Sequence, residues 1–181
     1  PLRRQAEERR LRWEAALTAQ HEISADGRTL TRVGNNPDIM LWAACRLLPT
    51  AGKSAWKVRV EESDGNEGYI CIGVCDAAAR HYWALYLGTG SVNHSARKAN
   101  GQCDLNARPP KDWPDAHHKP VMKDGGGRPA DLSGRAVGAM IEVLVDHDKG
   151  MLSYRVNNGP VFEALKGFPI GAALRPFAVC F

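Results

Sequence analysis

The sequence of 181 residues predicts an all-β fold, a bent antiparallel β-sandwich over residues 22–181, preceded by an N-terminal α-helix or linker over residues 1–21. Three observations lead to this prediction: short apolar stretches separated by Gly, Asn, Asp and Pro, alternation with period two, and successive hairpins with no helical period between them. Two sheets that bury each other's apolar faces fit this pattern. A chain of this length buries about 70% of its unfolded surface, so the fold needs no metal or disulfide.

The first twenty residues have a composition of their own. The segment PLRRQAEERRLRWEAALTAQ lacks Gly and is dense in Ala, Leu, Glu and Arg, which favours a helix. Leu2, Ala6, Trp13 and Leu17 would share one helical stripe. We favour a solvated helix that packs one edge on the domain. A longer coiled coil or linker helix stays open as the alternative.

Alternation marks the strands that follow. In residues 53–62, Trp56, Val58 and Val60 are expected to face the core, opposite Lys57 and Arg59. The stretch 69–74, YICIGV, is apolar on both faces and predicts a strand in the middle of a sheet.

The last third of the chain predicts consecutive strands joined by turns. Residues 137–145 and 152–156 alternate around the turn 146–150, and the turn 157–160 leads to strands at 161–162 and 174–181. Between the two halves, residues 88–134 are rich in Gly, Pro, Asn and Asp, and we expect a long irregular segment of the kind that often carries function.

Composition and motifs exclude several functions. A formal net charge of +4 is too small to indicate a nucleic-acid partner, and no apolar run reaches the about 20 residues of a membrane-spanning helix. The five cysteines form no CxxC pair, which indicates reduced thiols in a cytoplasmic or nuclear protein, and Cys71 and Cys75 are interpreted as buried core thiols. The sequence has no phosphate-binding loop, GxSxG elbow or metal-ligand series, so we expect no enzyme, no cofactor, no metal and no small-molecule substrate.

An ordered series of motifs over about residues 22–181 resembles the SPRY (B30.2-type) domains. The stretch 52–60 is similar to their strand G-x-x-x-W-E-V-x-V, residues 72–74 to the IGV strand that follows, and residues 143–157 to V-x-L-D…G-x-L-S-F-x-V-N-G. Residues 24–30 are similar to the first strand of that domain, and residues 162–177 to its closing A-F…L-x-P. The resemblance implies a bent, concanavalin-like sandwich that binds a protein or short peptide through loops, without a cofactor.

Local likeness is greatest to the SPRY domains of SOCS-box substrate receptors of ubiquitin ligases. Residues 81–88, HYWALYLG, are similar to their H-Y-x-x-L-L-G, and the match implies that Tyr82 and Leu85 line a peptide pocket. The loop 46–51 is similar to their R-x-P-x-A, with one extra residue between the arginine and the proline. The partner-binding residues expected on this basis, with a neighbouring rim and a loop tryptophan, are Tyr82, Leu85, Arg46, Pro49, Ala51, Asn35, Asn36, Asp38 and Trp113.

The sequence therefore predicts a non-enzymatic module for protein interaction, one part of a larger polypeptide and a candidate for substrate recognition in a ubiquitin-ligase-type protein. Two alternatives stay open. One is a structural subunit fixed in a large assembly, and the other is a basic module that associates with RNA or the ribosome through Arg3–Arg12.

Overall fold

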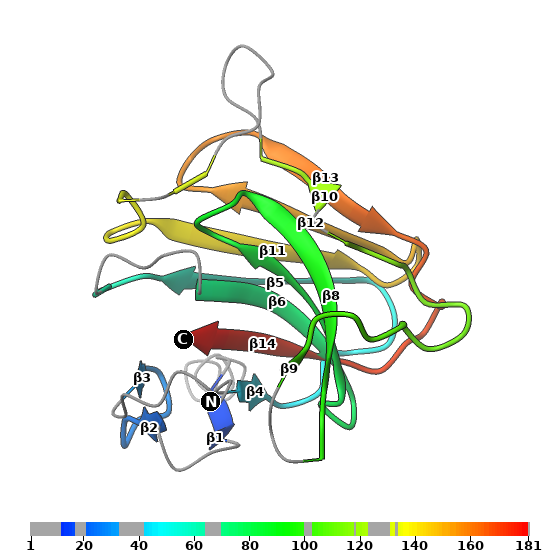
Figure 1. Ribbon diagram of the computed structural model, residues 1–181, viewed down its shortest axis with the longest axis horizontal. Helices are drawn as coiled ribbons and strands as arrows, with labels where there is room; N and C mark the ends of the chain where they lie inside the picture. Colours follow the sequence, from blue (N-terminus) through cyan, green and yellow to red (C-terminus); the bar gives the residue numbers. More distant parts are fainter. Residues whose placement is uncertain are drawn as a thin grey trace, which may run out of the picture.

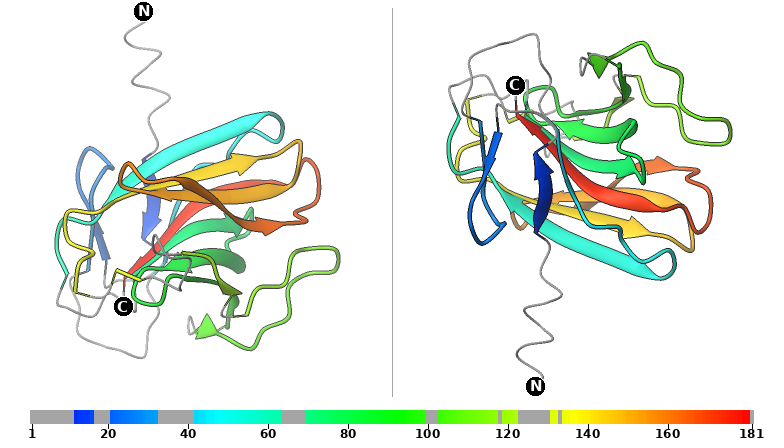
Figure 2. Two further views of the ribbon diagram at one scale, coloured as in Figure 1. Left: turned by 90° about the horizontal axis from the view of Figure 1, so that it is seen from above. Right: turned by 90° about the horizontal axis from the view of Figure 1, so that it is seen from below.

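Two stacked antiparallel sheets and a short hairpin make up the described part of the protein (Figures 1 and 2). This computed structural model describes residues 12–16, 21–32, 42–63, 70–99, 103–117, 119–122, 131–132 and 134–180. The described residues include no helix with the length and apolar character needed to span a bilayer.

The larger sheet has eight described strands, and all its pairings are antiparallel. In spatial order they are β1 (Trp13–Ala16), β4 (Trp42–Cys45), β14 (Leu174–Cys180), β6 (Ile70–Asp76), β7 (His81–Tyr86), β8 (Ser91–Arg97) and β10 (Lys119–Pro120), with β9 (Cys103–Asp104) also paired to β8. Since β14 pairs with β4 and β6, the two ends of the chain meet in one sheet.

The smaller sheet contains β13 (Val161–Lys166), β12 (Met151–Val156), β11 (Met140–Asp146) and β5 (Lys53–Arg59), in this order. β11 is paired along its length, with Val143 between Trp56 of β5 and Tyr154 of β12. A separate hairpin pairs β2 (His21–Ile23) with β3 (Leu30–Arg32).

The main core fills the space between the sheets. The larger sheet contributes Ile72, Val74, Trp83 and Leu85, and the smaller sheet contributes Trp56, Ile141, Val143, Leu152 and Tyr154. The hydroxyl of Tyr154 donates a hydrogen bond of 3.0 Å to the carbonyl of Ile72, which ties the two layers together.

The opposite face of the larger sheet carries a second buried cluster. It contains Cys71 and Cys75 of β6, Tyr82, Ala84 and Tyr86 of β7, and Phe177 and Val179 of β14. Because successive side chains of a strand point to opposite faces, β7 buries Trp83 and Leu85 on the sandwich side and Tyr82 and Tyr86 on the other. Burial raises the pKa of the Cys75 thiol, as expected of a core cysteine.

The strand expectations for 53–62 and 69–74 are confirmed over Lys53–Arg59 and from Ile70 on, whereas residues 60–62 follow the end of β5. Trp56 and Val60 are buried while Lys57 and Arg59 are exposed, and β6 lies inside its sheet between β14 and β7. The hairpins of the last third are present as β11–β12 and β12–β13, whereas β14 crosses to the larger sheet.

Two expectations require correction. Residues 13–16 form β1, paired with β4, where a helix was expected, because a backbone partner in a sheet outweighs a helix propensity of a few tenths of a kcal/mol per residue. The remainder of 1–20 lies outside the described residues. In the segment expected to be irregular, Ser91–Arg97 forms β8, whose polar side chains Asn93, His94 and Ser95 are buried. Residues 123–130 also lie outside the described residues.

Candidate functional site

Four connections gather at one end of the sandwich. The register pairs Asp146 with Lys53 and Leu174 with Asp76, so the connections before β5, after β6, after β11 and before β14 emerge together. We call these connections, residues 46–52, 77–80, 147–150 and 167–173, the loop surface. Loops on a rigid sandwich are a common place for binding residues.

The turn 147–150 fastens its neighbours on the loop surface. The amide of Gly52 donates to the carboxylate of Asp148 at 2.9 Å, and the amide of His147 donates to the Gly52 carbonyl at 2.9 Å. On its other side, the carbonyl of Gly150 accepts from the amides of Gly167 and Phe168, at 2.9 and 3.1 Å. Three of the four connections are thereby held together, by backbone hydrogen bonds and by one bond to the Asp148 carboxylate.

Gly150 is required where these loops meet. Its φ is +58°, in the left-handed region, and a Cβ built on it would lie 2.1 Å from the carbonyl oxygen of Phe168. A side chain at this position would therefore displace the connection 167–173.

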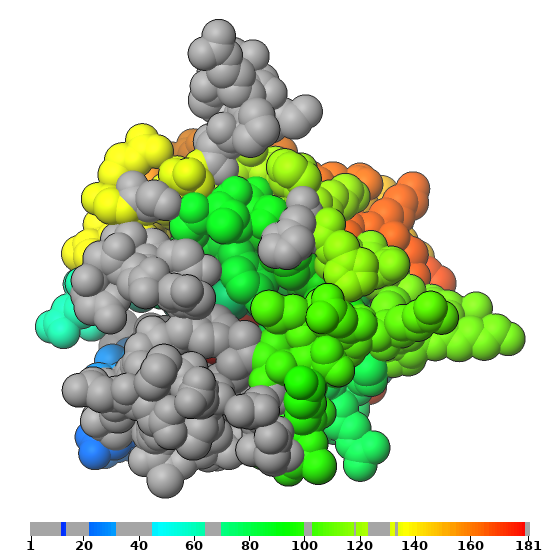
Figure 3. Space-filling model, in the orientation of Figure 1, coloured from blue at the N-terminus to red at the C-terminus, as the bar shows by residue number. Residues whose placement is uncertain are grey.

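An aromatic stack supports the connection 167–173 from below. Trp113 stacks on Trp83 with ring centroids 4.8 Å apart, and Phe168 meets both rings edge-on. The Trp83 indole N–H donates to the carbonyl of Pro114 at 2.8 Å, which holds the segment 103–117 in place. Figure 3 shows this green segment projecting beside the orange residues that precede β14.

A buried histidine, His94, and a partly buried one, His81, fix the same segment. His94 is fully buried, and burial together with the neighbouring His81 lowers its pKa to about 4. The neutral ring donates from Nδ1 to the Ala107 carbonyl at 3.1 Å and accepts at Nε2 from His81 Nδ1 at 3.1 Å. This pair thus supports the loop, and no three His, Cys, Asp or Glu side chains of the described residues are arranged to hold a metal ion.

Exposed apolar side chains mark the outer part of the loop surface. Ile170 is 68% exposed and Leu47 52% exposed, and they lie on connections joined by the Leu48 amide and the Leu174 carbonyl at 2.8 Å. Side chains of this kind in contact with water are available to a partner. Sequence reasoning missed both residues, although Ile170 stands between a proline and a glycine, where a turn would expose it.

The structure separates the partner-binding residues expected from the sequence. Arg46, Pro49 and Ala51 are exposed on the loop surface, and Trp113 is half-buried beneath it. Asn35, Asn36 and Asp38 lie outside the described residues, so their role stays a prediction.

Tyr82 and Leu85 occupy the interior. Both are 0% exposed, and because they are three residues apart on one strand their side chains point to opposite faces of the sheet. Tyr82 stacks on Phe177 at 4.8 Å, and its hydroxyl lies 2.6 Å from Cys103 Sγ. The two side chains therefore do not line a common pocket, and neither presents surface to a partner.

The solved structures that this chain resembles share one fold. They include the SPRY domain of human HERC1, with 18% identity, a TM-score of 0.56 and coverage of 88% of this chain and 84% of that one. The fold is SPRY-like. The TRIM65 PSpry domain matches at 15% identity and a TM-score of 0.54, covering 100% of this chain and 90% of that one. The neuralized NHR1 domain of Drosophila melanogaster matches at 15% identity and a TM-score of 0.51, covering 93% and 90%.

No protein-family model and no curated protein matches the sequence. The SPRY-like fold agrees with the motif series in residues 52–60, 72–74 and 143–157, which form β5, β6 and the β11–β12 hairpin. At these identities, the structural likeness concerns the fold alone.

Proposed function

We propose that this SPRY-like domain is a non-enzymatic module that binds a protein or short peptide through the loop surface. The single observation that carries the proposal is the exposure of Leu47 and Ile170 on connections whose backbones are fastened to one another. A preformed surface loses little conformational freedom on binding, so a few apolar anchors can supply most of the affinity.

The charge of the loop surface suggests how a partner is oriented. Arg46, Arg80 and Lys149 are exposed there, whereas Asp148 and Asp76 accept hydrogen bonds from the amides of Gly52 and Arg80. Cations around an apolar centre favour a partner segment with an apolar side chain next to acidic groups.

The role proposed for Tyr82 and Leu85 is indirect. They pack the strand that leads away from the loop 77–80, and they act on binding only through the stability of the sheet. Arg46, Pro49 and Ala51 are proposed as direct contacts, with Trp113 as the support of their neighbour 167–173.

Affinity capture with the full chain and matched variants tests the proposal. Ile170→Asp and Leu47→Asp should each reduce recovery of a captured partner about 30-fold, the effect of losing roughly 2 kcal/mol at a central anchor. Val161→Asp is the control, because Val161 is also exposed, at 47%, but begins β13 at the other end of the sandwich. Equal recovery with all three variants would refute the proposal.

The narrower form of the proposal is substrate recognition within a ubiquitin-ligase-type protein. Its support is the resemblance of residues 81–88 and 46–51 to SOCS-box receptors. Ubiquitylation of the captured partner that depends on Ile170 would support it, and a captured partner that is never ubiquitylated would count against it.

A further inference from the structure

The edge strand β5 lies beside a cavity that the loop surface does not use. The smaller sheet ends at β5, and within the described residues no strand pairs with the other side of β5. The larger sheet continues past this point through β14, β4 and β1, so part of its inner face extends beyond the smaller sheet. Figure 2 shows β5, in cyan, at the rim of the molecule in both views.

Hydrogen bonding defines which backbone groups of β5 point outward. His147 donates to the Gly52 carbonyl, and Val60 donates to the Ala139 carbonyl, so the even-numbered residues of this segment face β11. Hydrogen-bonded and non-hydrogen-bonded pairs alternate in an antiparallel ladder. The amides and carbonyls of Lys53, Ala55, Lys57 and Arg59 therefore point away from the sheet, where an added strand could pair with them.

A cavity of about 510 Å³ lies between β5 and the β2–β3 hairpin. Its walls include Trp56, Val58 and Val60 on one side and Thr29, Leu30 and Thr31 on the other, and Ile70, Ile72, Cys45, Trp13 and Ala178 belong to the larger sheet beneath. This volume is within the range of about 300–1,000 Å³ that is usual for ligand pockets. The charged residues Arg28, Lys57, Arg59, Glu61 and Glu62 also line the cavity, so it offers an apolar floor with charged groups around it, beside the free edge of β5.

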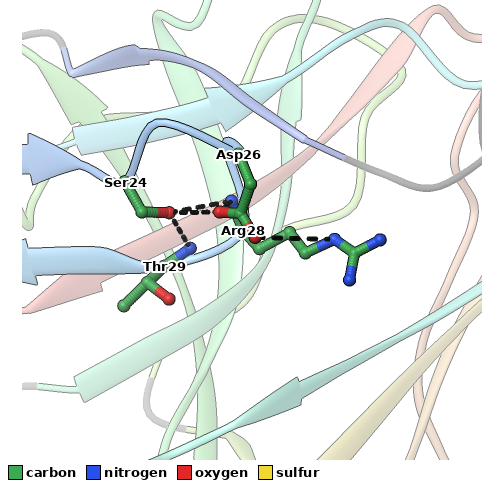
Figure 4. A network of polar contacts seen from close by, with 4 residues as sticks. All are labelled: Ser24, Asp26, Arg28 and Thr29. Atoms are coloured by element: carbon green, nitrogen blue, oxygen red, sulfur yellow. Dashed lines mark hydrogen bonds and ion pairs between the residues drawn. The ribbon is translucent and has the colours of Figure 1, made fainter.

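The far wall of the cavity is held by its own hydrogen bonds. In the turn of the β2–β3 hairpin, Ser24 Oγ lies 2.6 Å from Asp26 Oδ1 and accepts from the Thr29 amide at 2.9 Å (Figure 4). The hydrogen bond from Ser24, then the amide of Arg28, lowers the pKa of Asp26, which stays ionised at neutral pH. This wall therefore does not depend on an occupant.

Charge on β5 selects the occupant. Lys53, Lys57 and Arg59 are exposed and share the outer face of the sheet, on the residues whose backbone groups point outward. Lys53 Nζ is 3.8 Å from Asp146 and Lys57 Nζ is 3.9 Å from Glu142, which Arg155 contacts at 3.1 Å. Arg59 has no ion pair among the described residues, so it is the cation of this face with its charge left for a partner. A second copy paired antiparallel through β5 would bring like charges opposite each other, which is destabilising.

We propose that β5 accepts an additional antiparallel strand from a partner protein in which acidic residues alternate with bulky apolar ones. The acidic residues lie opposite Ala55, Lys57 and Arg59 on the outer face, and the apolar residues enter the cavity beside Val58 and Val60. This site lies on the flank of the sandwich, apart from the loop surface, and goes beyond the function proposed above.

Binding of a short synthetic peptide that alternates glutamate with valine and phenylalanine tests the proposal on the full chain. We expect saturable binding that is lost when the glutamate amides are N-methylated, because these amides face β5, and retained when the valine and phenylalanine amides are N-methylated. A peptide of the same composition in scrambled order should not bind. Absence of binding by the alternating peptide, or equal effects of both methylation patterns, would overturn the proposal.

Variants of the protein provide the second half of the test. Ala55→Pro removes one outward amide without changing charge, and proline is tolerated on an edge strand, so it should weaken peptide binding at least tenfold. Lys57→Glu with Arg59→Glu should weaken binding by a similar factor, whereas Ile170→Asp should leave it unchanged. If Ala55→Pro unfolds the domain, the two methylated peptides still decide the outcome. Self-association in sedimentation that Lys57→Glu strengthens would identify a second copy as the occupant and overturn the proposal.

Discussion

Replacement of Tyr82 by alanine distinguishes an interior role from a partner contact. The ring is 0% exposed and stacks on Phe177, and its hydroxyl lies 2.6 Å from Cys103 Sγ. Truncation of a buried aromatic side chain to alanine costs about 3–5 kcal/mol, because the lost apolar burial adds to the cavity that remains. This loss is a large share of the about 5–15 kcal/mol by which a typical domain is stable.

The expected loss in the free energy of unfolding can be divided between the aromatic ring and the hydroxyl of Tyr82. Tyr82→Phe keeps the ring and removes the hydroxyl with its contacts to Cys103 and Tyr86, so it should cost about 0.5–1.5 kcal/mol. For a domain of this length each kcal/mol lowers the melting temperature by about 2–4 °C. Tyr82→Ala should therefore lower it by roughly 6–20 °C and Tyr82→Phe by only a few degrees.

Urea unfolding followed by tryptophan fluorescence, together with a thermal scan, measures both variants. Ile170→Ala is the control, because a side chain 68% exposed should change stability by no more than about 0.5 kcal/mol. An unchanged unfolding midpoint for Tyr82→Ala would refute the interior assignment and return Tyr82 to the partner-binding surface.

Three further predictions concern the support of the loop surface. Gly150→Ala should cost about 1–3 kcal/mol more in the free energy of unfolding than Gly138→Ala, since both have positive φ but only Gly150 would place a Cβ against the Phe168 carbonyl; equal costs in urea titrations would contradict the clash. The folded-state pKa of His94 is about 4, below the ordinary value of 6.5, so between these two pH values the unfolded chain binds more protons than the folded one. The free energy of unfolding should therefore decrease by up to roughly 3 kcal/mol as the pH is lowered from 6.5 to about 4. His94→Gln should flatten that pH dependence, and an unaltered profile would show that other groups cause it. Trp113→Ala should cost roughly 2 kcal/mol and speed proteolysis within 103–117, and unchanged cleavage would show that the stack on Trp83 does not hold this segment.

Strands with one or two apolar faces could be predicted from the sequence. Around Trp56 and in β6, the pattern of apolar residue types is enough to show which side chains are buried. β1 and β8 could not be predicted this way. β1 has the composition of a helix and becomes a strand by pairing with β4, and β8 buries His94 through contacts with Ala107 and His81 that lie outside its own sequence.

For the candidate site, the sequence predicted the exposure of residues only where they lie in a polar loop. Arg46, Pro49 and Ala51 lie in a polar connection and are exposed, whereas Tyr82 and Leu85 were assigned by motif likeness and are interior. The strand period already places residues three apart on opposite faces, so alternation within HYWALYLG argues against a shared pocket. Ile170 could not be recognised from its type, because exposed and buried isoleucines differ only in tertiary context.

The pairing of β5 with β11 has a consequence for biosynthesis. β11 follows β5 by roughly 80 residues, so at the usual rate of about 5–20 residues per second the ribosome needs roughly 4 to 16 seconds to deliver the strand that pairs with β5. Throughout that interval, β5 of the nascent chain has an apolar face and no hydrogen-bonded strand on either edge. Newly made copies should therefore require a chaperone until translation passes the β11–β12 hairpin, and slower translation should lower the yield of soluble protein.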